Sequence, residues 1–378
     1  MFELTEDQQA VVEMVRDFAT TAIAPHAAEW DETKHFPVDV LREAGTLGMG
    51  GIYVREEFGG SGLSRTDAAL IFEELSKADP TIAAYISIHN MVVWMIDAFG
   101  NDEQRAQWVP QLASMEALGS YCLTEPGAGS DAAALSTKAV LDGDSYVLNG
   151  TKQFISGAGA SSIYVVMART ADTGSQGITA IVVPSDAPGL SFGPNEKKMG
   201  WNAQPTRQVI FEDVRVPVAN RLGEEGSGFG IAMKGLNGGR VNMGACSLGG
   251  GQAALEKSIA YLKSRSAFGG PLINQQSLLF DIADMDTELE TARTLILRAA
   301  DALDRGAPDT VRLCAMAKRV ATDAGFNVAN KAIQLHGGYG YLSEYGLEKI
   351  ARDLRVHQIL EGSNEIMRLI VGRLAVGA

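Results

Sequence analysis

The sequence predicts a mainly helical α+β protein in which a β-rich segment separates two helical ones. Apolar residues recur at helical spacing over residues 1–120. From 121 to 225 the apolar runs shorten and turn-forming pairs such as Asp-Gly interrupt them. Helical periodicity returns over 226–378, most clearly in a long amphipathic stripe at 274–305. We therefore predict three domains with these boundaries: an N-terminal helical domain, a middle β-domain and a C-terminal helical bundle.

Helix starts and stops are readable in the first domain. Thr5 and Gln8 have the spacing of a capping box, and Pro25 ends the helix that follows. Another helical pattern starts at Asn101, a residue that favours the N-cap position. Beyond the first helix, the pattern predicts helices over 38–47, 66–77, 81–98 and 101–113.

The middle domain contains signals for β-hairpins. Asp142-Gly143 and Asn149-Gly150 are dipeptides typical of tight hairpin turns. Runs rich in β-branched residues at 163–167, 178–183 and 209–211 predict strands. Together they predict a small antiparallel β-domain.

The third domain opens on an unusual stretch. Residues 228–262 are helical by spacing yet contain nine glycines, each of which costs about 1 kcal/mol against alanine in a helix interior. Close helix packing or a nearby ligand would explain that cost, and a loop over part of the stretch is the alternative. Pro308 then opens a further helix that reaches about residue 334.

Composition excludes several classes of function. The 378 residues are 46% apolar, so a sizeable core is available, and the net charge of −14 argues against nucleic acid as a general partner. Three cysteines lie far apart, and the five histidines show no metal-ligand spacing, so neither a disulfide framework nor a zinc site is expected. Residues 82–99 are the most apolar run, but polar residues interrupt it.

One carboxylate stands out near the C-terminal end. Glu361 follows the apolar pair Ile359-Leu360 and precedes Ser363, a predicted N-cap. The helix dipole favours the charged carboxylate there, and desolvation disfavours it. A base held between these effects could take a carbon-bound proton from a substrate, whereas the simpler interpretation is an ordinary acidic residue before a helix.

Two glycine-containing motifs precede it in the middle domain. The loop 121–131 formally matches a dinucleotide fingerprint, but Pro126 and the hairpins downstream are wrong for that fold, so it is either a flavin- or phosphate-binding loop or a plain turn. In Phe154-Ile155-Ser156-Gly157-Ala158-Gly159, the aromatic residue and the small hydroxyl residue suit the face and edge of a planar ring, with an ordinary strand end as the alternative.

Two more motifs lie in the third domain. Arg265 could pair with a pyrophosphate or simply complete a helix C-terminus. Residues 334–340 form a glycine-lined turn after a long helix, where a ligand could approach the backbone closely.

The order and spacing of these motifs resemble the acyl-CoA dehydrogenase family over essentially the whole chain. The matching stretches are 121–131, 154–156, 265–276, 334–340 and 361–363. Within the family, residues 200–206, 211–222, 235–240 and 356–368 are most similar to the members that oxidise isobutyryl-CoA.

The resemblance implies a helical domain, a β-domain and a four-helix bundle, usually in a homotetramer, with FAD as cofactor. Its FAD contacts would be Tyr121, Cys122, Leu123, Thr124, Gly129, Ser130, Phe154, Ile155, Ser156, Arg265, Phe268, Gln275, Gln276, Gln334, Leu335, His336, Gly337, Gly338, Ser363, Asn364 and Glu365, with Arg265, Gln275 and Gln276 reaching the FAD of a neighbouring subunit. Its substrate contacts would be Ser130, Asn237, Gly238, Gly239, Arg240, Gly362 and Arg373.

The implied reaction is α,β-dehydrogenation of a short branched acyl-CoA, isobutyryl-CoA to methacrylyl-CoA in valine catabolism. Glu361 matches the catalytic base, the β-hydrogen leaves as hydride to flavin N5, and electrons pass to an electron-transfer flavoprotein. Some family members place the base directly before the matching arginine, where this chain has Gly239. Medium-chain members carry Tyr at the position of Leu360, which leaves chain length and branching open.

Three alternatives remain at this point. The chain could act on 2-methylbutyryl- or straight short-chain acyl-CoA, it could be an oxidase that uses oxygen, or it could be an inactive family member that serves as a scaffold. The acidic start Met1-Phe2-Glu3-Leu4 is neither a signal nor a transit peptide by pattern. We expect a bacterial cytoplasmic enzyme, or a mitochondrial matrix enzyme if the chain is a mature eukaryotic one.

Overall fold

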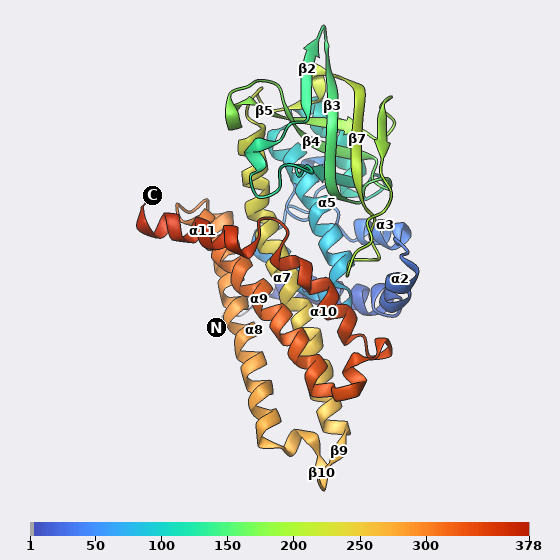
Figure 1. Ribbon diagram of the computed structural model, residues 1–378, viewed down its shortest axis with the longest axis vertical. Helices are drawn as coiled ribbons and strands as arrows, with labels where there is room; N and C mark the ends of the chain where they lie inside the picture. Colours follow the sequence, from blue (N-terminus) through green and yellow to red (C-terminus); the bar gives the residue numbers. More distant parts are fainter. Residues whose placement is uncertain (1–3, 378) are drawn as a thin grey trace.

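Helices flank a single large sheet in the computed structural model, which describes residues 4–377, so that Met1-Phe2-Glu3 lie outside the described residues (Figure 1). The sheet occupies one end of an elongated molecule and the long helices of the bundle occupy the other. The order of helical, β and helical parts confirms the predicted fold class.

The N-terminal part is helical throughout, and its predicted helices are all present. The helices are α1 (Glu6–Phe18), α2 (Ala27–Thr33), α3 (Val38–Thr46), α4 (Arg65–Ala78), α5 (Pro80–Phe99) and α6 (Asp102–Ala113). Thr5 and Gln8 form the predicted capping box, and Asn101 caps α6. Helix α5 is long and apolar enough to cross a membrane, but 78% of its most apolar window is buried inside the protein, as in a core helix.

The middle part is a sheet of eight strands. They are β1 (Gly119–Cys122), β2 (Lys138–Asp142), β3 (Ser145–Ser156), β4 (Ile163–Arg169), β5 (Ile178–Pro184), β6 (Leu190–Phe192), β7 (Thr206–Pro217) and β8 (Arg221–Leu222). Seven of them follow the order β6-β7-β3-β2-β4-β5-β8, and β1 pairs with β4. Most pairs are antiparallel as predicted, but β1 runs parallel to β4. Apolar side chains cover both faces of β4 and β5, so the sheet is anchored to the helices on one side.

One of the two predicted hairpin turns is wrong. The chain reverses after Asp142, between β2 and β3, but Asn149-Gly150 lies inside β3. The pairing of β3 with β7 shifts register between Leu148 and Gly150, and Gly150 has a φ of 148°. A glycine at a bulge in a continuous strand therefore produced the same dipeptide signal as a turn.

The C-terminal part is built on α7 (Gly228–Ser264), a 37-residue helix, so the loop alternative for this stretch is wrong. It is followed by β9 (Ser266–Ala267), β10 (Gly270–Pro271), α8 (Gln276–Asp304), α9 (Thr310–His336), α10 (Leu347–Arg355) and α11 (Asn364–Val376). Its glycines permit close packing: a Cβ at Gly251 would lie 3.1 Å from Cα of Gly325 on α9. A helix of small residues can thus lie against its neighbours along its length, which offsets the cost of the glycines.

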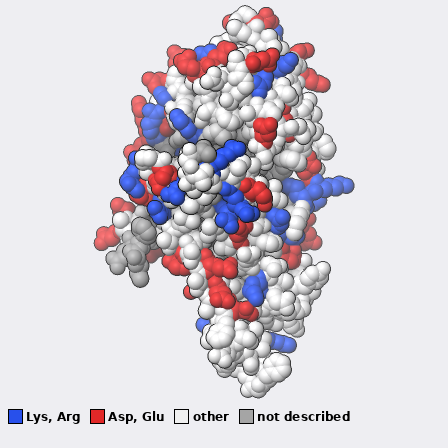
Figure 2. All heavy atoms as spheres, turned by 60° about the vertical axis from the view of Figure 1, so that its left-hand side comes forward, with Lys and Arg blue, Asp and Glu red and all other residues white. Residues whose placement is uncertain are grey.

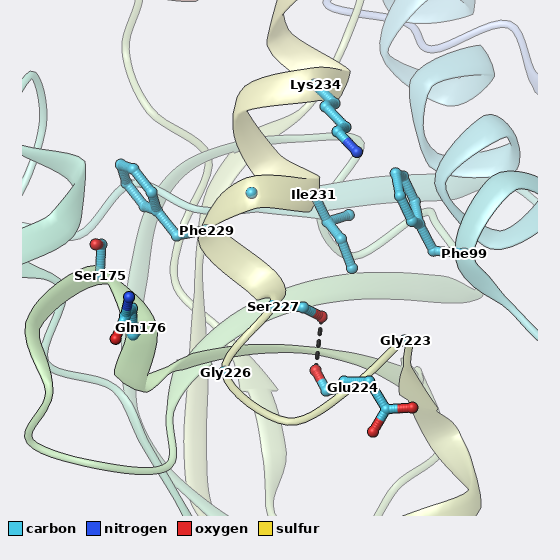
Figure 3. A pocket seen from close by; sticks show the side chains of 11 residues that line it. Phe99, Ser175, Gln176, Gly223, Glu224, Gly226, Ser227, Phe229, Ile231 and Lys234 are labelled. Atoms are coloured by element: carbon cyan, nitrogen blue, oxygen red, sulfur yellow. Dashed lines mark hydrogen bonds between the residues drawn. The ribbon is translucent and has the colours of Figure 1, made fainter.

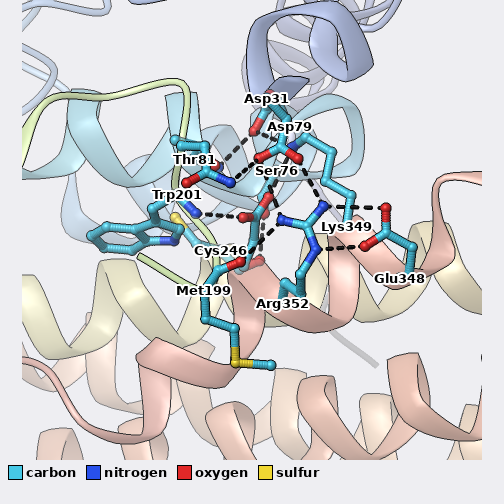
Figure 4. Close-up of polar contacts among 12 residues, drawn as sticks. Asp31, Ser76, Asp79, Thr81, Met199, Trp201, Cys246, Glu348, Lys349 and Arg352 are labelled. Atoms are coloured by element: carbon cyan, nitrogen blue, oxygen red, sulfur yellow. Dashed lines mark hydrogen bonds and ion pairs between the residues drawn. The ribbon is translucent and has the colours of Figure 1, made fainter. Parts of the chain in front are cut away.

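A buried polar cluster joins the three parts of the chain (Figure 4). Asp353 of α10 accepts a 2.6 Å hydrogen bond from the backbone N–H of Trp201 and pairs with Lys349 at 2.8 Å. Lys349 also pairs with Asp79 at the start of α5. Arg352 pairs with Asp31 of α2 at 2.7 Å. These contacts fix α10, and with it the segment that carries Glu361, against both other parts.

Candidate active site

Glu361 lies in a tight turn between α10 and α11. A 3₁₀ turn (Val356–Gln358) precedes it, and α11 begins at Asn364. Glu361 has a φ of 54° and Gly362 a φ of 91°, so both residues adopt the left-handed conformation. That conformation is costly for a residue with a Cβ and is often found at functional sites. Ser363 holds the predicted N-cap position, although its side chain makes no capping hydrogen bond.

The carboxyl group of Glu361 points at α7. A Cβ built on Gly239 would lie 2.8 Å from Cδ of Glu361 and closer still to Oε2. The Oε2 atom is buried, and no hydrogen-bond partner reaches it among the described residues. A buried carboxyl oxygen without a partner is unfavourable for folding, and it leaves one atom available to accept a proton.

Two cations from different helices surround this turn. Arg240 of α7 donates from Nε to the carbonyl oxygen of Glu361 at 3.2 Å, and from Nη1 to Asn237 at 2.8 Å. Lys318 of α9 donates from Nζ to the carbonyl oxygen of Gly362 at 3.0 Å. Burial raises the pKa of Glu361 to about 7, and Lys318 and Arg240 oppose that rise. The carboxyl group therefore has a pKa suited to accepting a proton near neutral pH.

The predicted flavin segments 121–124 and 154–156 lie side by side on the sheet. The backbone N–H of Gln153 donates to the carbonyl oxygen of Thr124 at 2.8 Å, and Ser120 Oγ donates to the carbonyl oxygen of Ser156 at 2.6 Å. Beneath them, Lys152 and Glu125 form an ion pair of 2.8 Å that is almost wholly buried. This pair fixes the loop that follows β1.

The exposed surface of these segments fits a planar aromatic cofactor. Phe154 is 63% exposed and has a φ of 59°, at a second register shift in β3. Side chains added at Gly127 or Gly129 would meet no heavy atom within 4 Å, so the loop surface is open. Within residues 4–377, no hydrogen-bond partner reaches the buried Oη of Tyr121. Burial, and then the charge of Glu361, raise the pKa of Tyr121, so this phenol lies within electrostatic range of the carboxyl group. The residues present therefore suit FAD.

A second group of predicted FAD contacts lies elsewhere. Arg265 and Gln334–Gly338 line one pocket of about 530 Å³ with Tyr261 and Tyr339. Arg265 is 26 residues beyond Gly239 on the same helix, about 39 Å at 1.5 Å per residue. No single dinucleotide spans that distance and also contacts the sheet. The structure thus brings the predicted residues together in two separate sites.

The other predicted residues have varied positions. Asn364 is buried between α9 and α11, where its side chain bonds Lys318, Thr322 and Asp323. Ser130 and Glu365 are exposed, and Phe268 is 92% exposed at the β9–β10 end of the molecule. Gln275 caps α8, and Gln276 begins it. Arg373 is exposed in the last turn of α11.

Sequence reasoning missed a pocket of about 450 Å³ at the start of α7 (Figure 3). Lys234 and Phe229 of α7 face it together with Phe99 of α5 and the loop residues Ser175 and Gln176. Lys234 is one turn before Asn237–Arg240 on the same helix. The glycines at 223, 226, 228 and 230 were the only local signal for it.

Sequence reasoning also missed Lys318, Tyr53 and Arg65. Lys318 is fully buried on α9. It follows Cys314 by four residues and precedes Thr322 by four, so helical spacing places it on the same buried face, and this spacing was the available signal. Tyr53 accepts a hydrogen bond from Asn242 at 3.2 Å, and the guanidinium carbon of Arg65 lies 3.4 Å from the centroid of its ring. These two residues come from a loop and a helix start without a recognisable motif.

Family models match the chain in three consecutive pieces. The acyl-CoA dehydrogenase N-terminal domain matches residues 5–116, the middle domain 120–214 and the C-terminal domain 226–375.

Individual proteins are similar over nearly the whole chain. The chain is 54% identical over 370 residues to a protein described as isobutyryl-CoA dehydrogenase, mitochondrial, from Bos taurus, and 55% identical over 371 residues to one of the same description from Dictyostelium discoideum. These alignments cover 98% of this chain and 89% of each relative. Among solved structures, a chain from work on the electron transferring flavoprotein of Acidaminococcus fermentans superposes with a TM-score of 0.98 at 39% identity, with 100% of both chains covered.

Proposed function

The chain belongs to the acyl-CoA dehydrogenase family, and on that premise we propose that it oxidises isobutyryl-CoA to methacrylyl-CoA with Glu361 as the base. It is an acyl-CoA dehydrogenase, and FAD is the cofactor of that family. The observation that carries the proposal is the buried, unpartnered Oε2 of Glu361 in the space left by Gly239. The identity of 54–55% to isobutyryl-CoA dehydrogenases supports the choice of substrate.

Each residue around the turn has a part in the proposed reaction. Glu361 Oε2 accepts the α-proton of the thioester, and its backbone N–H donates to the thioester carbonyl, which stabilises the negative charge that develops there. Bound FAD would supply the acceptor for the β-hydrogen and its electron pair, so that the Cα–Cβ bond becomes a double bond, and residues 121–124 and 154–156 would hold it. Arg240 holds the backbone of Glu361 during this transfer through the bond to its carbonyl oxygen. Glu361 releases the proton after the product leaves.

The start of α7 supports an assignment for the CoA part of the substrate. The pocket of Figure 3 lies about one turn before Asn237–Arg240. Lys234 and the helix N-terminus favour an anionic group there, and Glu224 on its rim opposes them. A thioester whose acyl group reaches Glu361 can thus place its polar end there. Leu360 is partly buried beside the base and would border the acyl group there.

The partners follow from the family and from the surface. An electron-transfer flavoprotein is the proposed electron acceptor, which the similarity to the Acidaminococcus work supports. A homotetramer is proposed because Arg265 and Gln334–Gly338 lie too far from Glu361 to serve the same FAD, so a second copy would present them. The β9–β10 end carries the exposed Phe268 and few charges (Figure 2), as an interface between copies would. The proposed compartment is the cytoplasm in a bacterium and the mitochondrial matrix in a eukaryote.

A panel of acyl-CoA substrates tests this function. The purified holoenzyme is assayed with isobutyryl-, 2-methylbutyryl-, isovaleryl-, butyryl- and octanoyl-CoA and an artificial electron acceptor. We expect the highest kcat/KM for isobutyryl-CoA, with roughly 10–200-fold discrimination against neighbours that differ by one methylene. A higher kcat/KM for octanoyl-CoA would contradict the proposed substrate, and electron transfer to oxygen at the rate seen with the acceptor would favour the oxidase.

A further inference from the structure

The side chain of Lys318 is buried at the base of the Glu361 turn. Its exposed fraction is 0%, and Nζ donates to the carbonyl oxygen of Gly362 at 3.0 Å and to Oδ1 of Asn364 at 2.9 Å. Among residues 4–377, no carboxylate oxygen lies within 4 Å of this ammonium group. A buried ammonium group without a salt-bridge partner is costly, so its retention calls for a reason beyond packing.

Two consecutive carbonyl groups are held by two cations. Arg240 of α7 binds the carbonyl oxygen of Glu361, and Lys318 of α9 binds that of Gly362. Glu361 and Gly362 both have positive φ, a conformation that is unfavourable for a residue with a Cβ such as Glu361. The two bonds come from opposite sides of the turn and compensate for that strain. Without Lys318, the second carbonyl and Asn364 lose their shared donor.

We propose that Lys318 is a positioning residue for the base: its ammonium group fixes the turn from Glu361 to Asn364 and stabilises the ionised form of the Glu361 carboxyl group. This inference rests on the proposed role of Glu361. The nearby Arg240 already bonds Asn237 and the Glu361 carbonyl oxygen. The hydrogen bonds of Lys318 go only to the turn, and Glu361 is the foremost of the carboxylates that favour its charged form.

The other titratable groups around the site do not supply this stabilisation. The pKa values of Tyr53, Tyr121 and Cys246 are raised by burial, so these groups stay neutral beside Glu361. Burial lowers the pKa of His357, to about 3, so it is neutral as well. The groups facing Lys318 itself are Glu361, Arg240, Asp323, Glu365 and His357.

The pH range in which both groups are charged is narrow. Burial raises the pKa of Glu361 to about 7. Burial lowers the pKa of Lys318 to about 8, and Arg240 lowers it too, while Glu361 acts in the opposite direction. An ionised base beside a protonated lysine is therefore most populated between these values. Because kcat/KM reports the free enzyme, its pH profile should show an acid limb from Glu361 and an alkaline limb from Lys318.

The test is this pH profile in three variants of the holoenzyme. Lys318→Met removes the charge and the donor, Lys318→Gln keeps a donor without the charge, and Thr322→Val removes a neutral partner of the same Asn364 as the matched control. We expect both Lys318 variants to move the acid limb up by at least one pH unit and to abolish the alkaline limb. Activity at pH 7 should fall at least about fivefold, as a shift from pKa 7 to 8 implies, and recover at pH 9, more completely in Lys318→Gln.

Unshifted limbs in Lys318→Gln, with activity merely scaled down or unchanged, would overturn the proposal. A shift of the same size in Thr322→Val would overturn it too, because a neutral perturbation of the turn would then be sufficient. If Lys318→Met fails to retain FAD, the pH profile of Lys318→Gln alone tests the proposal. A fully active Glu361→Gln protein would remove the proposed function itself, whereas an inactive one combined with unshifted Lys318 profiles removes only this inference.

Discussion

The carboxyl group of Glu361 occupies the space that a side chain on Gly239 would need. The two residues are 122 positions apart, on the turn before α11 and in the middle of α7, and a Cβ on Gly239 would lie 2.8 Å from Cδ of Glu361. The position of the Glu361 carboxyl group therefore depends on residue 239 having no side chain. In family members that place the base directly before the matching arginine, a carboxyl group on the helix equivalent to α7 would occupy this space.

Gly239→Ala should displace the base. The added methyl group would overlap the carboxyl group, and a misplacement of about 1 Å can cost on the order of 100-fold in rate. We expect kcat to fall by about that factor while FAD remains bound, as measured by steady-state assay and flavin absorbance. The matched control is Gly372→Ala on α11, a helical glycine where an added Cβ meets no heavy atom within 4 Å. Normal kcat in Gly239→Ala would show that the carboxyl group is free to move aside.

Arg265→Ala should weaken FAD retention and the assembly of copies. A charge-assisted hydrogen bond to a diphosphate contributes about 1.5–3 kcal/mol, so we expect a roughly 10–150-fold increase in the Kd of FAD. Lys263→Ala is the control, because it removes a cation from the last turn of the same helix. Flavin content and size on gel filtration are measured together. If both variants behave alike, Arg265 has only the helix-terminus role.

Acid should destabilise the flavin-side loop through Glu125. Burial alone would raise the pKa of this carboxyl group, but Lys152 and bonds from Ser136 and Thr137 hold it at about 2, below its ordinary 4.5. The folded state thus gains stability that is fully present above about pH 5 and is lost as pH falls toward 2, roughly 3 kcal/mol in total. The Tm of the wild type should therefore fall more steeply between pH 5 and 3 than that of Glu125→Gln. Parallel Tm curves for the two proteins would contradict this assignment.

Local patterns in the sequence were sufficient for most of the fold. The capping box at Thr5, the N-cap at Asn101 and the helical periods gave the right helices, because each signal depends on neighbours in the chain. Asn149-Gly150 failed because its role depends on β7, which lies about 60 residues further on. The nine glycines of α7 make sense only against the surfaces of the helices that pack on it.

The site was predictable only in part, because some of its residues act through contacts with residues far away in the chain. Glu361 and the loop 121–131 carry local signals and a family resemblance. Lys318 has neither, because a lysine between Ala317 and Arg319 resembles many surface lysines until the Gly362 carbonyl group is placed beside it. Its importance comes from a contact over 44 positions in the chain, which no periodicity encodes.

The central claim is that Glu361 removes the α-proton of the substrate, and single-turnover reduction of Glu361→Gln tests it most directly. The anaerobic holoenzyme is mixed with isobutyryl-CoA and flavin absorbance is followed, with Glu103→Gln, an exposed acid on α6, as the control. The amide is nearly the same size as the carboxyl group and cannot accept the proton. We expect the Glu361→Gln protein to remain yellow, with reduction at least 1,000-fold slower than in the wild type, as on the order of 10²–10⁴ is ascribed to one acid–base group. Reduction at the wild-type rate in a Glu361→Gln protein that retains FAD would contradict the account and place the base elsewhere.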